Sequence, residues 1–567
     1  MVVSPFILGT ICLSLTGINL VSASCEPEVS FPPPRYTDTS LQDAFKTVTS
    51  NLDKAIKAGD FKGTSFSLEI SSSQKTLYSK YHTDKSLKKT RVNGDSVYRI
   101  ASNTKLFTAL GILQQEAAGK LSLDDRVVEH IPKLPMNKTR FDWERITIRS
   151  LLAHLSGIPD NYGDNDLYLQ LEDPTVVGLP PISASRAKAL PKCNEYDNYS
   201  RSCTDSELNN AIRHSVPVFP AQSESTYSND AYDLLGQILA RVSGMKYEEY
   251  ISQAILNPLG LKGTSFTTPS SSAGVDIGPE SQWGENLGAD NASGGIYSTS
   301  SNMITFLRWI LNNYNSITPR LNWLQPATWS TGSHSTLGYP WEIFRTTSLI
   351  PNSRRPVTFY TKGGGLTGYY SYSIVIPAYD LVVFMAMGGN LPSQTTIFTS
   401  ILNPLVLGAE DVAEAQLKKD YAGTYTFHSA GGTALNSSMM LTQNTPRALH
   451  ISSLVSNSTD VLAALGPLVG QKSGVSSGIY FALQPTFLSR TSADGHVGEV
   501  WRFINVIDDY DAPVNPSTVW DDYCVSNVDP LAYAGVPLNE VIFWREQGDA
   551  PVEEVELSAF DVRLRRE

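Results

Sequence analysis

The sequence lacks the features on which nucleic-acid-binding proteins and metalloenzymes depend. Its 567 residues carry a formal net charge of -12, and lysine and arginine form few runs. Phosphate binding needs clustered positive charge, so we expect no nucleic-acid partner. The eight histidines are scattered without the spacing of metal ligands, and we expect neither a metal ion nor an organic cofactor.

Long apolar runs are also scarce, and the one that is present lies at the N-terminus. Residues 2–21 contain no charged side chain, and Val21, Ser22 and Ala23 resemble a signal-peptide cleavage site. The usual lysine or arginine near the start is missing, so a membrane anchor is the competing interpretation. Because polar residues interrupt the stretch, we predict a signal peptide over residues 1–23, a secreted protein, and no stable membrane span after cleavage.

Cysteine is rare, with five residues in the chain. If Cys12 leaves with the signal peptide, four remain, and four cysteines in an oxidising compartment allow three pairings. We expect Cys193 to pair with Cys203 across a short polar loop and Cys25 to pair with Cys524. The alternative is free, buried thiols. The N-glycosylation signals that fit the same secretory route are at Asn137, Asn198, Asn291, Asn436 and Asn457.

Ser102 and Lys105 open an amphipathic stretch at residues 100–119. Helical spacing places the serine hydroxyl and the lysine amine on one face, at the helix end that favours negative charge. The same S-x-x-K spacing begins at Ser72, Ser86, Ser185 and Ser243. Only Ser102 follows a short apolar segment and starts a long helical pattern. Taken alone, it is explained equally well as a catalytic serine or as a helix cap.

The pattern of the remaining chain alternates between helices and hairpins. One hairpin is predicted around the turn at residues 71–74, and another around the turn at residues 377–380. We therefore predict an α+β fold in which an antiparallel sheet is flanked by helices. Helices are predicted at residues 41–58, 146–155, 204–213, 230–242, 247–256 and 303–311. The predicted domains are a Pro-rich N-terminal segment at residues 24–40, a catalytic domain at 41–407 and a smaller β-rich domain at 408–567.

A serine nucleophile also needs a base, donors for the developing oxyanion, and a group that holds the base in its reactive protonation state. Tyr227 and Asn229 precede a predicted helix and form one candidate pair. Lys362, followed by the glycine run at 363–365 after a predicted strand, forms another. Each is weak alone, because the first spacing recurs at Tyr196 and glycine runs often form turns. Their order and local context favour a catalytic set.

Together, these elements resemble the serine β-lactamases and penicillin-binding proteins, in particular the class C β-lactamases and their esterase relatives. The likeness covers residues 41–407, including family-like stretches at residues 146–159, 257–266 and 293–299. By position, the resemblance implies that Ser102 attacks a carbonyl carbon and that Lys105 shares its proton network. It also implies that Tyr227 acts as the general base and that Asn229 contacts the substrate.

The same resemblance implies that Lys362 steers an anionic group or holds Tyr227 in its active state. The backbone around Gly364 and Gly365 would bind the substrate, with the N–H groups of Ser102 and Gly365 forming the oxyanion hole. A cation about 4 Å from a phenolate stabilises it by roughly 4 kcal/mol at an effective dielectric constant near 20, so two lysines make Tyr227 a usable base.

One departure from the family pattern concerns the residue after Lys362. The family's threonine or serine is Gly363 here, so a hydroxyl that often binds a substrate carboxylate is missing. This favours esters or other acyl groups over penicillin-like substrates. No deacylating glutamate is evident: residues 205–209 are better explained by a capping box formed by Thr204 and Glu207.

We therefore predict a secreted serine hydrolase that forms an acyl-enzyme on a small ester or amide substrate. The sequence does not indicate whether the protein is a monomer or an oligomer. The alternatives are an acyltransferase or cyclase in small-molecule biosynthesis, and a secreted binding protein that has lost turnover. An α/β-hydrolase is a third alternative, because residues 474–478 match G-x-S-x-G, but a strand-like run follows where a helix is required. His154 is interpreted as support for a helix end.

Overall fold

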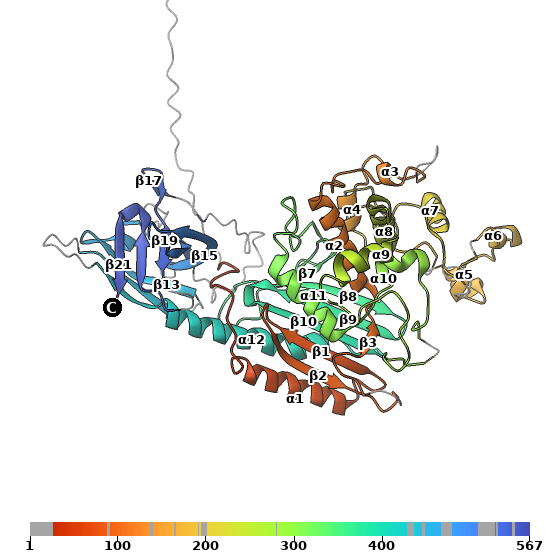
Figure 1. Cartoon of the computed structure of the whole chain (residues 1–567), viewed down its shortest axis with the longest axis horizontal. Coiled ribbons are helices and arrows are strands. Elements are labelled where there is room, and N and C mark those ends of the chain that lie inside the picture. The colour runs from red at the N-terminus through yellow and green to blue at the C-terminus, as the bar shows by residue number, and fades with distance from the viewer. Residues whose placement is uncertain are drawn as a thin grey trace, which may run out of the picture. The chain divides into compact units, whose positions relative to one another are not determined.

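The computed structural model divides the chain into two compact units (Figure 1). The structure describes residues 26–87, 91–134, 140–163, 166–190, 192–193, 201–278, 281–427, 436–444, 448–465, 479–507, 528, 531–546 and 550–567. The larger unit comprises Pro33–Leu349 and Val357–Val412. The smaller unit comprises Ala413–Glu567 together with Ile350–Pro356 and residues 26–32. All the candidate catalytic residues lie in the larger unit.

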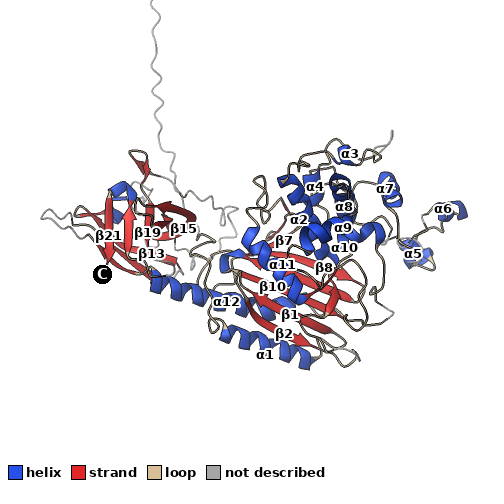
Figure 2. Ribbon diagram, in the orientation of Figure 1, coloured by secondary structure: helices blue, strands red, loops and turns tan. Residues whose placement is uncertain are grey.

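An antiparallel sheet of eight strands forms the centre of the larger unit (Figure 2). The strand order is β2-β1-β10-β9-β8-β7-β6-β5, so the hairpins predicted from opposite ends of this unit meet where β1 pairs with β10. The strands are β1 (Ser65–Ser71), β2 (Thr76–His82), β5 (Thr328–Trp329), β6 (Ser335–Leu337), β7 (Glu342–Thr346), β8 (Val357–Leu366), β9 (Tyr369–Ile376) and β10 (Leu381–Gly388). A separate pair is formed by β3 (Val97–Arg99) and β4 (Tyr297–Thr299).

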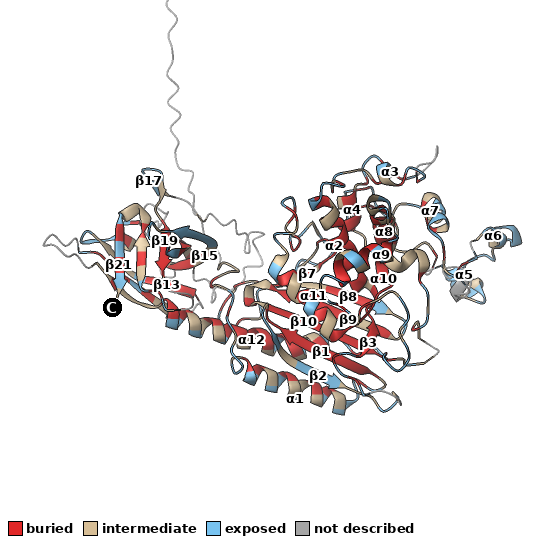
Figure 3. Ribbon diagram, viewed as in Figure 1, coloured by how far each residue is buried: buried red, intermediate tan, exposed pale blue. Residues whose placement is uncertain are grey.

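Side chains alternate between the two faces of this sheet, and in strands β1 and β10 both faces are buried (Figure 3). Val375 and Phe384 belong to the main hydrophobic core, on the face that α11 (Ser300–Asn313) covers. Ile374 and Val383 point to the opposite face and line a small apolar cavity with side chains of α12 (Gln394–Asp420). The predicted α+β sheet with flanking helices is confirmed.

The main core continues into a layer of helices in which α2 (Thr104–Ala117) packs on α8 (Asn229–Ser243). Gly111 permits a close approach, because a Cβ there would stand 2.9 Å from Leu239 Cδ1. The other helices of this unit are α1 (Gln42–Ala58), η1 (Ala101–Asn103), α3 (Val127–His130), α4 (Ile148–Leu152), α5 (Leu167–Gln170), η2 (Pro174–Val177), α6 (Ala184–Ala189), α7 (Asp205–His214), α9 (Tyr247–Ile251), η3 (Ser252–Leu256), η4 (Gly288–Asp290), α10 (Asn291–Gly294) and η5 (Pro377–Tyr379).

Several element boundaries differ from the sequence prediction. The helix predicted at residues 146–155 is shorter, since α4 ends at Leu152 and His154 adopts a left-handed backbone with φ 58°. The segment at 247–256 begins as α9 and continues as the π-helical turn η3. The glycine run at 363–365 lies inside β8 instead of following it, because these residues pair with β9.

The smaller unit contains a sheet of nine strands among the residues that the structure describes, which confirms the β-rich prediction. Its strands are β11 (Gly423–Thr426), β12 (Ser438–Asn444), β13 (Ala448–Ser456), β14 (Thr459–Asp460), β15 (Ile479–Thr491), β16 (Val497–Ile507), β19 (Glu540–Trp544), β20 (Glu554–Leu557) and β21 (Val562–Arg566). The hairpin of β17 (Ala532–Tyr533) and β18 (Val536–Pro537), the helix α13 (Val461–Leu465) and the turn η6 (Ser558–Phe560) complete it.

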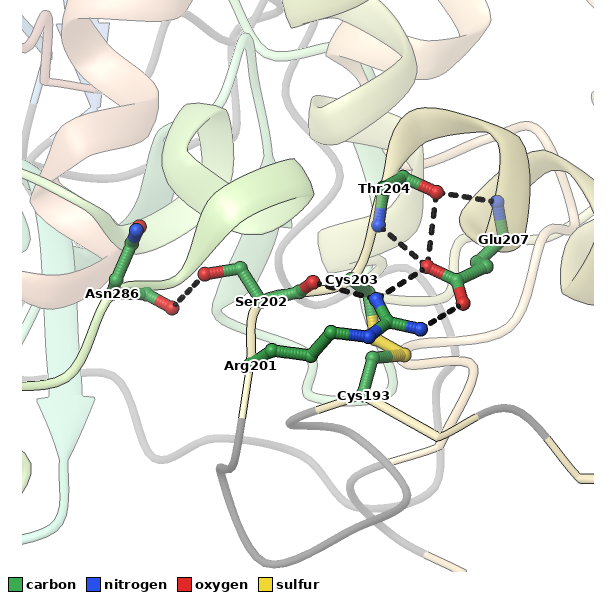
Figure 4. The surroundings of a disulfide bond; sticks show 7 residues. All are labelled: Cys193, Arg201, Ser202, Cys203, Thr204, Glu207 and Asn286. Atoms are coloured by element: carbon green, nitrogen blue, oxygen red, sulfur yellow. Dashed lines mark hydrogen bonds and ion pairs between the residues drawn. A yellow bond between two sulfur atoms is a disulfide. The ribbon is translucent and has the colours of Figure 1, made fainter.

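Cys193 and Cys203 form a disulfide, as predicted (Figure 4). The capping box predicted beside it is also confirmed: Thr204 Oγ1 accepts from the N–H of Glu207, and the Glu207 carboxylate accepts from the N–H of Thr204 at 3.0 Å. Arg201 stabilises this capping box through an ion pair of 2.6 Å with Glu207. The disulfide therefore leads directly into the first turn of α7.

Several predicted features lie outside the described residues. These are the signal peptide at 1–23, the pair Cys25 and Cys524, the glycosylation signals at Asn137 and Asn198, and the G-x-S-x-G match at 474–478. None of the helices in the described part of the chain is both long and apolar enough to cross a membrane.

Candidate active site

Ser102 lies in the 3-10 turn η1, between β3 and α2. The turn is fixed on both sides: the N–H of Ile100 donates to Ile296 O at 3.1 Å, and the N–H of Ile296 donates to Thr104 Oγ1 at 3.1 Å. Ala101, just before the serine, adopts a left-handed backbone with φ 48°. Such a conformation is costly for a residue with a Cβ and persists only where its surroundings hold it. The backbone is thus bent at the point where the serine is presented.

Lys105 is fully buried one helical turn after Ser102, and its ammonium donates to three oxygens. These are Ser102 Oγ at 3.2 Å, Asn229 Oδ1 at 2.5 Å and Ser293 O at 2.9 Å. An ammonium has three N–H donors, so its hydrogen-bonding capacity is filled. Lys105 consequently joins the serine to two segments that lie far away in the sequence.

Asn229 is the first residue of α8, and its amide is held in one orientation. The Nδ2 group donates to Asp160 Oδ1 at 3.0 Å and to Asn161 Oδ1 at 2.9 Å, which leaves Oδ1 to accept from Lys105. The preceding residue, Ser228, caps the helix by accepting from the N–H of Ala231 at 3.0 Å. The helix cap therefore sets the position of the asparagine.

Tyr227 lies between two ammonium groups. Lys105 Nζ is 5.1 Å and Lys362 Nζ is 5.0 Å from the centroid of its ring. Burial alone would raise the pKa of the Tyr227 phenol, but the positive charges of the two lysines outweigh burial, and the pKa lies below its ordinary value. A hydrogen-bonding interaction with Ser102 acts in the same direction. The phenolate is therefore more accessible here than in a free tyrosine.

His154 stacks on Tyr227, which the sequence did not indicate. The two ring centroids are 4.6 Å apart with an interplanar angle of 26°, and the imidazole is fully buried. Its Nδ1 accepts from the N–H of Ser228 at 3.1 Å. Burial and the nearby charges of Lys105 and Lys362 hold the pKa of His154 well below its usual range, so the ring is neutral. The residue does follow a helix end, as expected, but it also supports Tyr227.

Lys362 lies in β8 and is 1% exposed. Its ammonium donates to Glu342 Oε1 at 2.5 Å and to Gly363 O at 2.7 Å. Burial would lower the pKa of Lys362, but the negative charge of Glu342 and the field of Tyr227 outweigh it and raise the pKa. Sequence reasoning missed Glu342, because β7 and β8 become neighbours only through the sheet, where Glu342 pairs with Thr361.

Gly364 brings β8 against the serine turn. A Cβ at this position would stand 2.3 Å from Ile100 O and 3.1 Å from the Ser102 nitrogen, so no larger residue fits without moving the backbone. Ser371 on the neighbouring strand ties the two parts together, since its hydroxyl donates to Ile100 O at 2.7 Å. A Cβ at Gly365 would meet only the Tyr370 ring, at 3.7 Å. The two glycines thus differ sharply in how much room they have.

The structure brings the predicted set together in one place. Hydrogen bonds link Lys105 to Ser102 and to Asn229. Tyr227 interacts electrostatically with Lys362, and Gly364 packs closely against the turn that carries Ser102. Gly365 follows it in β8. Among the residues that the structure describes, no group of three or more histidine, cysteine, aspartate or glutamate side chains is placed to hold a metal ion. The arrangement offers a hydroxyl beside an amine and a phenol of lowered pKa, which is suited to proton transfer from the serine.

Comparison with known protein families agrees with this geometry. Residues 52–401 match the family described as Beta-lactamase. The chain belongs to the beta-lactamase family. The remaining part, residues 413–567, matches a family described as Beta-lactamase-like-like, C-terminal domain. The resemblance seen in the three sequence elements is therefore confirmed.

Two relatives of this beta-lactamase family member match almost the whole chain. A protein named probable hydrolase M10 from Phoma sp. is 36% identical over 99% of this chain and 94% of its own length. A protein named probable hydrolase clz13 from Cochliobolus lunatus is 34% identical over 96% of this chain and 91% of its own. Among solved structures, a D-stereospecific amidohydrolase from Streptomyces sp. is 21% identical, with a TM-score of 0.47 over 63% of this chain and 97% of its own.

Proposed function

We propose that the chain is a serine hydrolase that cleaves small ester or amide substrates through an acyl-enzyme at Ser102. The observation that carries this proposal is the direct contact of 3.2 Å between Lys105 Nζ and Ser102 Oγ, beside a tyrosine whose pKa is lowered. A serine hydroxyl is a weak nucleophile until a neighbouring base takes its proton. Tyr227 in its phenolate form is that base, and Lys105 stabilises it.

In the acylation step, Ser102 Oγ forms a bond to the substrate's carbonyl carbon while its proton passes to Tyr227. The carbonyl oxygen becomes an oxyanion, which the N–H groups of Ser102 and Gly365 stabilise. The bond to the leaving group then breaks, and the proton held by Tyr227 goes to the leaving oxygen or nitrogen. Both N–H groups of the Asn229 amide are taken by Asp160 and Asn161. Its Oδ1 accepts from the ammonium of Lys105, so the role of Asn229 is to position that lysine and not to contact the substrate as the resemblance implied.

In the deacylation step, water replaces the leaving group. Tyr227 takes a proton from the water as its oxygen bonds to the acyl carbon, and the proton returns to Ser102 Oγ as the ester bond to the serine breaks. The positive charges of Lys105 and Lys362 lower the pKa of Tyr227 and so favour its phenolate form between the two steps. The enzyme is thereby restored with no group consumed except water.

Replacement of Ser102 tests this proposal. Ser102→Ala should abolish hydrolysis of p-nitrophenyl esters and labelling by a fluorophosphonate probe, with an unchanged melting temperature. Ser86→Ala is the matched control, because Ser86 has the same S-x-x-K spacing but lies exposed with its hydroxyl on Asp84. Retained turnover in Ser102→Ala would refute the assignment. A folded wild-type protein that neither turns over nor takes the probe would indicate a binding protein on the same scaffold.

We also propose that the protein is secreted. The disulfide between Cys193 and Cys203 supports this, because such bonds persist in oxidising compartments. Two of the glycosylation signals, at Asn436 and Asn457, lie on exposed residues, whereas the amide of Asn291 donates to Glu248 at 2.8 Å. N-terminal sequencing of protein from the culture medium should find a chain that begins near residue 24. A full-length chain retained in the cell would contradict the proposal.

A further inference from the structure

The contact between Lys362 and Glu342 resembles the way a protein holds a free carboxylate. Both carboxylate oxygens of Glu342 are engaged: Oε1 accepts from Lys362 Nζ at 2.5 Å, and Oε2 accepts from the backbone N–H of Gly363 at 2.8 Å. A cation and a backbone N–H that point at the two oxygens of one carboxylate form an anion site. In this chain, that site is filled by a side chain of the protein.

Lys362 already donates two of its three N–H groups within the protein, to Glu342 Oε1 at 2.5 Å and to Gly363 O at 2.7 Å. Its ammonium also lies 5.0 Å from the centroid of the Tyr227 ring. The side chain is 1% exposed, whereas the side chain of Glu342 is 37% exposed. A molecule that approaches this part of the site from solvent therefore reaches the carboxylate before the ammonium.

The missing side chain at Gly363 is part of the same arrangement. A Cβ at this position would stand 3.4 Å from Glu342 Oε2 and 3.6 Å from Tyr372 Cε1. The glutamate oxygen thus lies just beyond the place where a side chain of residue 363 would begin. A Cβ alone would make only ordinary contact there, so what the glycine removes is the hydroxyl that a serine or threonine would offer to an anionic ligand.

We infer that Glu342 occupies the place of a substrate carboxylate beside Lys362, so that the site selects acyl substrates that carry no negative charge at this point. The inference rests on the proposed acyl-enzyme function of Ser102. The ion pair has no net charge to attract an anion, and a second carboxylate brought to it meets the negative charge of Glu342. Glu342 is therefore a specificity-determining residue.

Matched pairs of substrates test this inference. One pair is p-nitrophenyl valerate and mono-p-nitrophenyl glutarate, in which the carboxylate is on the acyl side. The other is phenyl butyrate and 3-carboxyphenyl butyrate, in which it is on the leaving group. We expect the wild-type protein to show a kcat/KM at least 10-fold higher for the neutral member in at least one pair. A preference for the charged member in either pair would overturn the inference.

Two substitutions of Glu342 complete the test. Glu342→Gln keeps the shape of the side chain and removes its charge. Glu342→Ala removes the charge and also leaves the position beside Lys362 unfilled. In the pair that the wild-type discriminates, both should raise the ratio of charged to neutral kcat/KM at least 10-fold, mainly through KM for the charged member. Glu144→Gln, an exposed acid paired with Arg126, removes the same charge elsewhere and should leave the ratio unchanged.

The outcomes separate this inference from the function on which it rests. If a fluorophosphonate still labels Ser102 in both variants but the ratio stays within twofold of wild-type, Glu342 does not select against charge and the inference alone is wrong. If Ser102→Ala retains turnover, the acyl-enzyme assignment fails and this inference fails with it. If a variant does not fold, the wild-type preference in the substrate pairs decides the question.

Discussion

The close approach of β8 to the serine turn makes Gly364→Ala the sharpest single test of the site. The added Cβ would stand 2.3 Å from Ile100 O, 2.7 Å from Ser371 Oγ and 3.1 Å from the Ser102 nitrogen. Carbon atoms pack at about 3.5–4.0 Å, so the strand and the turn must separate by about 1 Å. This movement shifts the N–H of Gly365 relative to the N–H of Ser102.

The expected loss follows from that displacement. A misplacement of about 1 Å in a catalytic constellation costs about 100-fold in rate, and loss of one oxyanion donor costs about 100- to 1,000-fold in kcat. We expect Gly364→Ala to lower kcat by about 100-fold. Overpacking of this kind also destabilises by about 1–3 kcal/mol. The fall in kcat should therefore exceed what partial unfolding at the assay temperature can explain.

The assay compares three alanine substitutions. Steady-state hydrolysis of a p-nitrophenyl ester gives kcat and KM, and thermal unfolding gives stability. Gly365→Ala, whose Cβ meets only a tyrosine ring at 3.7 Å, should lose far less activity than Gly364→Ala. Gly284→Ala, which has nothing within 4 Å, should match the wild-type in both measurements. Wild-type kcat in Gly364→Ala would refute the placement of the oxyanion donors, and equal losses at both positions of β8 would do the same.

Further predictions concern charge and support around Tyr227. Activity should rise with pH through the lowered pKa of Tyr227, and Tyr227→Phe should lose that limb of the pH–kcat profile; an unchanged limb would assign it to another group. Lys362→Gln removes one of the two cations, so the limb should move to higher pH. His154→Ala should lower kcat about 10-fold, and His154→Phe, which keeps the stacked ring, should restore part of the loss. If the wild-type protein and both variants are equally active, His154 has no positioning role. Burial raises the pKa of Asp380 to about 6, so the neutral carboxyl group favours folding at low pH and this contribution is lost as the pH rises through 6. Asp380→Asn should therefore raise the free energy of unfolding at pH 8 by about 1 kcal/mol after solvent screening. The prediction is contradicted if the substitution raises the melting temperature no more at pH 8 than at pH 5.

The helices and hairpins of the larger unit were predictable because their signals are local. The spacing of apolar residues gave α1, α8 and the strands β1, β2, β9 and β10, and S-x-x-K in its helical context singled out Ser102. The capping box of α7 was equally readable, since both of its partners lie within four residues.

Residues that depend on sheet pairing or on packing across the chain were not predictable in this way. Glu342 reaches Lys362 because β7 pairs with β8, and no spacing in the sequence encodes that register. His154 reaches Tyr227 through a turn and a stacking contact between segments that are far apart in the sequence. These contacts decide the electrostatics of the site, so the sequence predicted which candidate groups come together better than it predicted their surroundings.

Strands β20 and β21 carry a sequence signal of a different kind. Their apolar residues alternate with charged ones, and the charged residues pair across the strands, as Arg565 does with Glu554 at 2.8 Å. A search for apolar runs passes over such strands, although alternation of this kind is typical of a sheet with one solvated face.

The contacts of Lys105 have a consequence for how the enzyme becomes active during synthesis. Its ammonium depends on Asn229 and on Ser293, which lie 124 and 188 residues further along the chain, and Tyr227 receives its second cation from Lys362. An unfinished chain that has emerged only as far as α2 carries Ser102 without Tyr227, Asn229 or strand β8. Under the mechanism proposed above, Ser102 would therefore become reactive only when most of the larger unit has been made.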